Sequence, residues 1–598
     1  MRDNKNLMIN QNTVAWHTEY PRSWFNNLVF YSSFVAVLLA IFDTGFEFNL
    51  WFQGFTSSFY LLALTLSLIE LLLHCRRWYA RSTMLAVFNT LTAMLVVALI
   101  VTHFVDEDSS LLYKFLFEKS LIKIAVLLSF IRQLFERDFE FKFAVTHPAQ
   151  LFIISYLLLI LLGTFLLMMP NASYGYLSFV DALFTATSAV CITGLTVKDT
   201  GAFFTPLGQV IIICLIQLGG LGILTFATYF GYFFRGKISY ETQLTIGQVT
   251  ASNRLGDVLK TLKVILVVTF GVELMAAIAI YLSVLDLPMS TSNRLFFAIF
   301  HAISAFCNAG FSTLSDSLHH EQVQFNYALQ LIIVVTFLFG GLGFVIVANV
   351  LSYLKHRLLR LVSPNPHRHG AKPWLLSINS RISLVTSAVL LVLGFLVAMA
   401  AEWQGVLTDH ASFWGKLVTA IFIAATPRSS GFNTMDMTQL AFPTVMMMIG
   451  LMWVGASPNS TGGGIKTSTL AVAVLNIWSI ARGYTRIEVF QREIADISVR
   501  RAFAVMCLSV ILIAIGCTMI RWAEPNFNFS QILFESVSAY STAGLSLGIT
   551  PDLTPFSKLV LVALMFIGRV SALTILIALF NRLQHQNYRY PSEEIIIN

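Results

Sequence analysis

The stretches FTATSAVCITGLTV (184–197), FHAISAFCNAGFST (300–313), IFIAATPRSSGFNT (421–434) and FESVSAYSTAGLSL (534–547) decide the fold of this chain. They align on Gly194, Gly310, Gly431 and Gly544, which follow one another at intervals of 116, 121 and 113 residues. Each stretch is amphiphilic, ends in a polar run and is too short to cross a membrane twice as a helix. Four copies in register indicate an internal repeat.

The residues around each glycine predict a short helix, a loop and a further helix. A serine able to cap the short helix lies near the start of each stretch, at Ser178, Ser292, Ser412 and Ser530. Three loops are followed by related glycine-bearing apolar segments, QLGGLG (217–222), LFGGLG (338–343) and FIGRVS (566–571). The third is followed instead by WVGASPNSTGGGIKTST (453–469). The second part of the chain therefore reads as four copies of span, short helix, glycine loop and span.

The composition is that of a membrane protein. Of 598 residues, 56% are hydrophobic and 12% charged, and the mean hydropathy is +0.74; a soluble chain carries about twice that charged fraction. Apolar runs of about twenty residues are long enough to cross a bilayer as helices. Twelve spans are predicted, at 26–42, 55–73, 84–104, 111–131, 148–169, 207–233, 260–284, 327–354, 382–401, 440–480, 501–521 and 557–581. The polar start of the chain does not resemble a cleavable signal peptide.

The net charge of +7 is placed in loops between spans. The basic loops are 74–82, 132–142, 235–260, 355–381 and 482–501. All of them fall on one side if both termini are cytoplasmic, which is the positive-inside pattern. This placement argues against a nucleic-acid partner and predicts a multi-pass protein embedded in a lipid bilayer. The six cysteines form no C-x-x-C pair and are interpreted as small apolar residues.

The glycine loops suit a monovalent cation. Backbone carbonyls can replace the hydration shell of such an ion without presenting a full charge. Glycine allows positive φ values, and the short helix before each loop aims its partially negative carbonyl end toward a common axis. None of the four loops carries an Asp or Glu near its glycine. The sequence therefore predicts an all-α polytopic membrane protein with four span–pore-helix–span repeats around one pore, plus four additional N-terminal transmembrane helices.

The four loops, SPNSTGGGIKTST (457–469) and FIGRVSALT (566–574) resemble the potassium uptake superfamily that includes TrkH, KtrB and the plant HKT transporters. The resemblance covers about 147–582 and is greatest to the bacterial TrkH/KtrB branch, because of STGGGIK and the third loop ending SSGFNT. It implies a K+ filter formed by Cys191, Ile192, Thr193, Gly194, Cys307, Asn308, Ala309, Gly310, Arg428, Ser429, Ser430, Gly431, Ser541, Thr542, Ala543 and Gly544.

Glycine at all four key positions goes with potassium preference in this family, whereas serine in the first loop goes with sodium permeation. Arg428 departs from expectation, because a cation inside the filter would repel K+. Its side chain is expected to point behind the loop, toward a helix carbonyl end. A Na+-permeable or Na+-coupled transporter of the same fold is the main alternative, and H+-coupled symport also stays open.

The resemblance also implies an intramembrane gate below the filter. Pro458 and the glycine run interrupt the span, and such a polar stretch must be buried or line a cavity. The predicted gate residues are Ser457, Pro458, Thr461, Gly462, Gly463, Gly464, Lys466 and Arg569. Arg569 is expected to bond the gate loop, with packing against helix carbonyls as the alternative, and snorkelling to the cytoplasmic interface is an alternative for Lys466. A phosphate loop is disfavoured because Ile465 separates Gly464 from Lys466.

The predicted regions are an accessory four-helix membrane region (1–145), four pore repeats (146–240, 258–356, 380–483 with the gating loop, and 500–583) and a cytoplasmic tail (584–598). For the first region, a voltage-sensor-like module is weighed against a lipid-facing bundle. The basic residues of 114–135 are Lys114, Lys119, Lys123 and Arg132, and this irregular spacing favours the bundle.

The resemblance implies a homodimer, a cytosolic nucleotide-binding regulatory subunit of the TrkA/KtrA type and a bacterial inner-membrane location. K+ is the expected transported ion, with no organic cofactor. A membrane-embedded enzyme is the rival class, but Glu70, Glu273, His301 and Glu535 are scattered along the spans rather than paired at metal spacing. His301 and Glu535 are interpreted as buried, hydrogen-bonded residues.

Overall fold

The computed structural model describes residues 24–46, 49–73, 83–103, 119–136, 148–222, 258–362 and 377–580. Within these ranges the regular secondary structure is helical apart from one antiparallel pair of short strands, β1 (Glu488–Val489) and β2 (Arg492–Glu493), and an isolated bridge between Ser173 and Phe204. Six of the described helices are long and apolar enough to cross a membrane, and eight spans result if each bent pair counts as one. The prediction of an all-α polytopic membrane protein is confirmed. The predicted tail 584–598, Cys75 and most of the basic loops lie outside the described residues.

The chain divides into two compact units, of which the first is Met1–Phe141 with Phe230–Ile238. Its helices are α1 (Trp24–Gly45), α2 (Leu50–Leu73), α4 (Thr83–His103) and α6 (Lys119–Glu136). Apolar residues from all four pack into one core. Two ion pairs attach α6 to its neighbours: Lys123 Nζ lies 2.7 Å from Asp43 of α1, and Arg132 Nη2 lies 2.5 Å from Glu70 of α2. These pairs neutralise two of the basic residues that the sequence places on α6.

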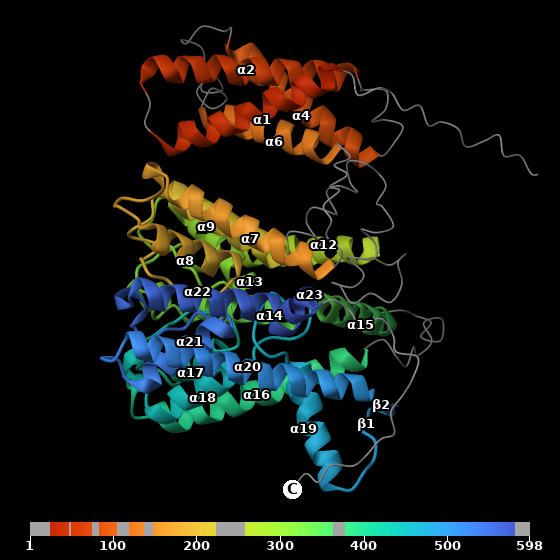
Figure 1. Ribbon diagram of the computed structural model, residues 1–598, viewed down its shortest axis with the longest axis vertical. Helices are drawn as coiled ribbons and strands as arrows, with labels where there is room; N and C mark the ends of the chain where they lie inside the picture. The colour runs from red at the N-terminus through yellow and green to blue at the C-terminus, as the bar shows by residue number, and fades with distance from the viewer. Residues whose placement is uncertain are drawn as a thin grey trace, which may run out of the picture. The chain divides into compact units, whose positions relative to one another are not determined.

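The second unit, Lys142–Tyr229 with Ser239–Asn598, contains the glycine loops (Figure 1). Its chain passes four times through a long helix, a shorter helix and a third helix. These helices are α7 (Pro148–Leu167), α8 (Phe179–Val190) and α9 (Pro206–Leu221); α12 (Val258–Ser283), α13 (Thr291–Phe306) and α14 (Tyr327–Leu342); α16 (Ile378–Glu402), α17 (Phe413–Ala425) and α18 (Phe442–Trp453); and α20 (Asp496–Ala523), α21 (Phe529–Tyr540) and α22 (Pro555–Val570).

Further elements extend or connect these helices. They are α15 (Phe344–Val362), α19 (Thr467–Ala481), α23 (Ala572–Leu579) and the 3-10 turns η1 (Pro170–Ala172), η3 (Ser317–His319), η5 (Val406–Asp409), η6 (Met437–Gln439) and η7 (Thr550–Asp552). How these elements divide into functional segments at 146–240, 258–356, 380–483 and 500–583 stays a prediction.

Side-chain caps begin the short helices α8, α13, α17 and α21. Ser178 Oγ accepts a hydrogen bond from Asp181 N, and Ser412 Oγ accepts one from Gly415 N, as predicted. The caps predicted at Ser292 and Ser530 are wrong. Ser290 caps α13, and Asn528 caps α21. A cap must be the last extended residue before the helix, and the sequence offers several polar candidates within two residues of each start.

Two predicted spans are broken rather than continuous. Span 327–354 divides into α14 and α15 at Gly343, whose φ is 84°. Span 557–581 divides into α22 and α23 with a bend of 85° at Ser571, which has φ 76° and ψ 124°. Gly222 ends α9 with a similar φ of 75°, and residues 223–233 of that predicted span lie outside the described residues. A left-handed residue therefore ends three of the four third helices.

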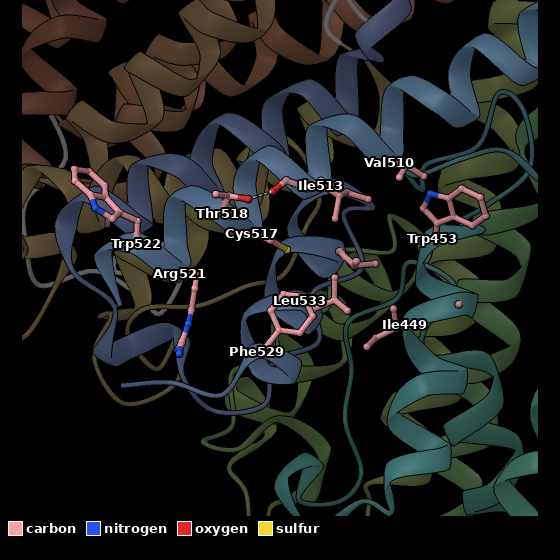
Figure 2. A pocket seen from close by; sticks show the side chains of 13 residues that line it. Ile449, Trp453, Val510, Ile513, Cys517, Thr518, Arg521, Trp522, Phe529 and Leu533 are labelled. Atoms are coloured by element: carbon pink, nitrogen blue, oxygen red, sulfur yellow. Dashed lines mark hydrogen bonds between the residues drawn. The ribbon is translucent and has the colours of Figure 1, made fainter. Parts of the chain in front are cut away.

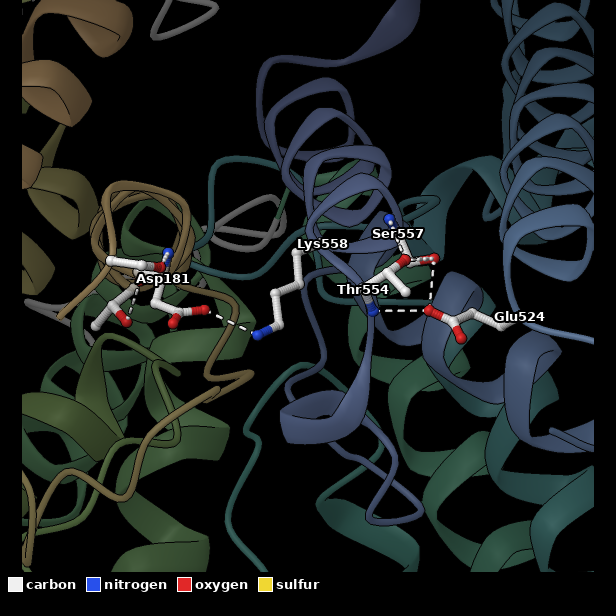
Figure 3. Close-up of polar contacts among 7 residues, drawn as sticks. Asp181, Glu524, Thr554, Ser557 and Lys558 are labelled. Carbon is white, nitrogen blue, oxygen red and sulfur yellow. Dashed lines mark hydrogen bonds and ion pairs between the residues drawn. The ribbon is translucent and has the colours of Figure 1, made fainter. Parts of the chain in front are cut away.

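Buried carboxylates hold the ends of the helices together. Lys558 of α22 forms a 2.8 Å ion pair with Asp181 of α8, which joins the last short-helix group to the first (Figure 3). Glu524 at the end of α20 accepts hydrogen bonds from Thr554 N and Ser557 Oγ at the start of α22. Glu402, at the end of α16, does the same for Ala441 N and Thr444 Oγ1 at the start of α18. A carboxylate is favourable at a helix N-terminus because it faces unpaired N–H groups.

Ser571→Gly is expected to stabilise the protein by about 1 kcal/mol. A side chain at φ 76° and ψ 124° is strained by about 1–3 kcal/mol, and the added chain entropy of glycine offsets only part of that gain. The midpoint of thermal unfolding of the purified protein in detergent measures the change. Ser571→Ala is the control, because it keeps the Cβ and therefore the strain; a lower midpoint for Ser571→Gly would contradict this account.

Candidate functional site

The four glycines lie in a ring. A Cβ built at Gly194 would lie 2.3 Å from Ala309 O, and one at Gly310 would lie 2.8 Å from Ser430 O. A Cβ at Gly431 would lie 3.1 Å from Ala543 O, and one at Gly544 would lie 2.1 Å from Thr193 O. Each loop thus touches the next one in chain order, and the fourth returns to the first. The space that a side chain would need is occupied by the backbone of the neighbouring loop.

The backbone of the four loops follows one pattern. Each glycine has a positive φ: 90° at Gly194, 70° at Gly310, 77° at Gly431 and 80° at Gly544. So does the residue two positions earlier, at Ile192, Asn308, Ser429 and Thr542, with values between 49° and 63°. The residue between these two positions in each loop does not have a positive φ. Such alternation of the sign of φ can turn successive carbonyls toward one central axis, whereas the carbonyls of a strand alternate sides and those of a helix point along the helix itself.

Hydrogen bonds attach three of the loops to their short helices in the same way. The residue before the glycine donates its N–H to the carbonyl five residues earlier: Thr193 to Ser188, Ala309 to Ser304 and Ala543 to Ser538. Ser188 Oγ also accepts from Gly194 N and donates to Leu195 O at 2.7 Å. In the third loop Ser430 donates to Thr426, only four residues earlier. The third loop is therefore the irregular member of the ring.

The glycines of the third helices have a packing reason. Cβ atoms built at Gly219 of α9, Gly340 of α14 and Gly568 of α22 would lie 2.1, 1.9 and 1.7 Å from carbonyl oxygens. Those oxygens belong to Val190, Phe306 and Tyr540, the last residues of α8, α13 and α21. Each third helix thus lies directly against the end of its short helix. The sequence indicates these glycines but not their partners.

Arg428 points away from the ring. Its Nη2 donates to Ser387 Oγ at 2.9 Å, and its Nη1 donates to Ser387 O at 3.3 Å, both in the long helix α16. The guanidinium is buried. The expectation that this side chain points behind the loop is confirmed, but its partner is a residue inside α16 and not the carbonyl end of a helix. Its charge is therefore displaced from the centre of the ring.

Residues 454–466, between α18 and α19, form a loop packed against the ring; we call it the GGG loop. Thr461 Oγ1 donates to Phe306 O at 3.4 Å, at the end of α13. A Cβ at Gly463 would lie 2.2 Å from Thr542 Oγ1, and one at Gly462 would lie 3.0 Å from Ser429 Cβ. The GGG loop therefore contacts the second, third and fourth glycine loops.

Two cationic side chains bond to the GGG loop. Arg569 of α22 donates from Nη1 to Thr461 O and from Nη2 to Gly219 O of α9, the latter at 2.8 Å. Both alternatives considered for Arg569, the gate loop and a helix carbonyl, thus occur together. Lys466 Nζ donates to Gly462 O at 2.6 Å. This bond argues against the snorkelling alternative for Lys466, because it directs the ammonium to a carbonyl of the GGG loop itself.

Two buried ionisable residues occupy the same register of their short helices, nine residues before the glycine. His301 of α13 contacts Ser312 Oγ at 2.9 Å through Nε2. Glu535 of α21 accepts hydrogen bonds from Ser546 Oγ and, at 3.0 Å, from Thr550 Oγ1. Their interpretation as buried, hydrogen-bonded residues is confirmed. In both loops the partner is the serine two residues after the glycine. His301 and Glu535 therefore fix the chain segment that follows the ring glycine.

A cavity of about 560 Å³ lies over the ring and is lined by all four glycines and by residues that follow them. Asp199, Asp316 and Asp436 contribute carboxylates to its wall, and Lys198 and His319 contribute basic groups. A hydrogen bond from the Thr438 hydroxyl lowers the pKa of Asp436 and keeps its carboxylate charged. The ring is therefore open to a polar vestibule.

Comparisons with known proteins identify relatives along most of the chain. Residues 117–589 match a family model, TrkH, described as a cation transport protein. This match extends beyond the resemblance found at 147–582 and begins within the fourth predicted N-terminal span. The chain is 34% identical over 459 residues to the potassium/sodium uptake protein NtpJ of Enterococcus hirae, which covers 75% of this chain and 97% of that protein.

A second relative is the Ktr system potassium uptake protein B of Bacillus subtilis, 33% identical over 462 residues, or 77% of this chain and 99% of that protein. The fold resembles the crystal structure of the potassium transporter TrkH from Vibrio parahaemolyticus. The TM-score is 0.57 with 17% identity, and the similarity covers 83% of this chain and 96% of that one.

Gly568→Ala is expected to abolish transport while leaving a folded protein. The added methyl would lie 1.7 Å from Tyr540 O, so α22 has to move off the end of α21 and the fourth ring loop loses its support. Uptake by cells expressing the variant, normalised to its amount in the membrane, measures the effect. Gly271→Ala in α12 is the matched control, because its Cβ would have nothing within 4 Å; equal uptake by the two variants would contradict the packing argument.

Proposed function

The chain belongs to the TrkH family of cation transport proteins, and from this premise we propose that it takes up K+ through one pathway at the ring of Gly194, Gly310, Gly431 and Gly544. The mutual contact of the four loops carries this proposal. Four carbonyl-bearing loops around one axis supply ligands from all sides, as a dehydrated monovalent cation needs. The members named above are transporters, so the protein is a transporter and not an enzyme.

Buried hydroxyls on the loops support an ionic or aqueous occupant. Thr193 Oγ1, Ser541 Oγ and Thr542 Oγ1 are buried and have no hydrogen-bond partner within the described part of the chain. Buried polar side chains are almost always paired, with protein or with water. A passing cation and its accompanying water would satisfy these oxygens together with the carbonyls. The loops carry no carboxylate, which favours weak, reversible binding of K+ over tight binding of a divalent ion.

The GGG loop is proposed as the gate. It lies against three of the four glycine loops, and Arg569 holds it through Thr461 O. Glycines give this segment several accessible backbone conformations, and the bonds from Arg569 and Lys466 favour the one described. Arg569 also places a positive charge beside the path, which opposes cation passage until the loop moves.

The remaining assignments follow from the family. A cytosolic nucleotide-binding subunit is proposed to act on the gate, because the Bacillus subtilis relative described above is named as a protein of a Ktr system. A homodimer and a bacterial inner-membrane location are proposed from the family resemblance, and cytoplasmic termini are proposed from the placement of the basic loops. Residues 1–145 are proposed as an accessory bundle.

Sodium is the specific alternative, since one relative is named a potassium/sodium uptake protein. It would use the same ring. The two ions differ in the carbonyl geometry that they require. We favour K+ because all four ring positions are glycine.

Expression of the protein is expected to restore growth of a K+-uptake-deficient bacterium at low K+, with a stronger effect when a regulatory partner is supplied.

Gly194→Ser is expected to lower the ratio of K+ to Na+ permeability at least several-fold, because its Cβ would collide with Ala309 O. Reversal potentials in K+ and Na+ gradients measure the ratio. Ser173→Gly, outside the four loops, serves as a control. Failure of rescue together with equal permeability of the wild type would overturn the proposal.

Arg569→Gln is expected to raise the rate of K+ flux without changing ion selectivity. It removes charge-assisted hydrogen bonds of about 1.5–3 kcal/mol each to Thr461 O and Gly219 O, and it removes a positive charge beside the path. Radiotracer uptake in proteoliposomes measures the rate. Arg482→Gln, an exposed arginine after α19, makes the same charge change elsewhere. A shift in selectivity would assign Arg569 to the filter instead of the gate.

A further inference from the structure

An apolar groove lies between the long helix α20, the short helix α21 and α18 (Figure 2). It encloses about 740 Å³. The polar side chains of its wall are engaged within the protein: Thr518 Oγ1 donates to Ala514 O at 2.8 Å, and Trp453 Nε1 donates to Ser509 Oγ at 3.0 Å. The surface of the groove is therefore apolar along most of its length, including at Leu533 of α21.

Gly450 leaves one side of the groove open. It belongs to α18, and a Cβ built there would meet nothing within 4 Å. Glycine inside a helix costs about 1 kcal/mol relative to alanine. The ring glycines and those of the third helices are explained by contacts with backbone, whereas no group in the described part of the chain meets a Cβ at this one. Its absent side chain enlarges a space that another molecule can fill.

Arg521 and Trp522 stand at one end of the groove, in the last turn of α20. Arg521 is exposed, and Nη1 donates to Pro525 O at 2.9 Å and Phe527 O at 2.5 Å. These two bonds fix the guanidinium, while a guanidinium has further N–H donors on Nε and Nη2. Trp522 is 83% exposed. An exposed Trp beside Arg at the end of a span is typical of the lipid headgroup level.

The nearby carboxylate does not compete for Arg521. Glu524 is 8% exposed and accepts hydrogen bonds from Thr554 N and Ser557 Oγ of α22 (Figure 3). Its charge is thus directed to the start of that helix. The positive charge of Arg521 therefore remains at one end of the apolar groove. A cationic group beside an apolar surface is what an amphiphile with an anionic head requires.

We propose that this groove binds an anionic glycerophospholipid, with its phosphate at Arg521 and an acyl chain along α20 and α21. A helix of a second copy fits less well. A helix is about 10–12 Å across with its side chains, so ten residues fill roughly 1,000 Å³, and a helix there would remove Arg521 from water without an anionic partner. The lipid chain packs against α21, the short helix that precedes Gly544, so this site borders the ring without belonging to it.

Tryptophan quenching by lipids with brominated acyl chains tests the proposal on the full-length protein in vesicles. The signal of Trp453, taken as the difference between wild type and Trp453→Phe, reports an acyl chain in the groove. Brominated phosphatidylglycerol is expected to bind about fivefold more tightly than brominated phosphatidylcholine, as one arginine near a membrane surface favours an anionic lipid. Arg521→Gln is expected to reduce this ratio to about one, and Lys416→Gln, a cationic residue of α17, is expected to keep it.

Gly450→Leu is expected to fill the groove and abolish quenching of Trp453. Gly271→Leu in α12 is the matched control, because a Cβ there also meets nothing within 4 Å. Quenching that is equal for both lipids and insensitive to Arg521 would reveal ordinary boundary lipid and overturn the site. Absence of Trp453 quenching in a dimer, with quenching restored in the monomer, would show that a second copy covers the groove.

Discussion

Four carbonyl-bearing loops occupy the space that four side chains would otherwise need, and the rest of the second unit depends on this constraint. A Cβ at Gly544 would lie 2.1 Å from Thr193 O, so the ring closes only with glycine at that position. Closure in turn requires each short helix to end at the same depth. The glycines at 219, 340 and 568 achieve this, because they let α9, α14 and α22 rest directly on the last carbonyl of α8, α13 and α21.

The third member of the ring breaks this rule in a way that accounts for the GGG loop. In α18 no helical glycine meets the end of α17. The glycine that follows α18, Gly455, lies against Gly463 O instead, where a Cβ would come within 2.1 Å. A carbonyl of the GGG loop thus takes the place that a short-helix carbonyl takes in the other three members. The segment that departs from the repeat is therefore built into the support of the ring.

The sequence predicts the parts of this structure that local chemistry determines. The four glycines, the short helices before them and the rearward direction of Arg428 follow from spacing, hydropathy and the cost of a charge in a cation path. The caps at Ser290 and Asn528 were not identified, because neighbouring serines have the same chemistry. The sharp break at Ser571 was not predicted either, since nothing in the residue type marks a left-handed position. The bond from Lys466 to Gly462 O depends on how the GGG loop folds, which no pattern in the chain encodes locally.

The ring and the GGG loop share their mechanical support, so neither can move alone. Gly568 lets α22 pack directly against Tyr540 O at the end of α21. The next residue, Arg569, donates a hydrogen bond to Thr461 O of the GGG loop. Gly463 meanwhile lies against Thr542, two residues before the ring glycine of the fourth loop. Displacing the GGG loop therefore removes contacts from the fourth glycine loop. It also disturbs α22, the helix that supports the fourth glycine loop. The proposed filter and the proposed gate therefore form one packed assembly, in which α22 supports both.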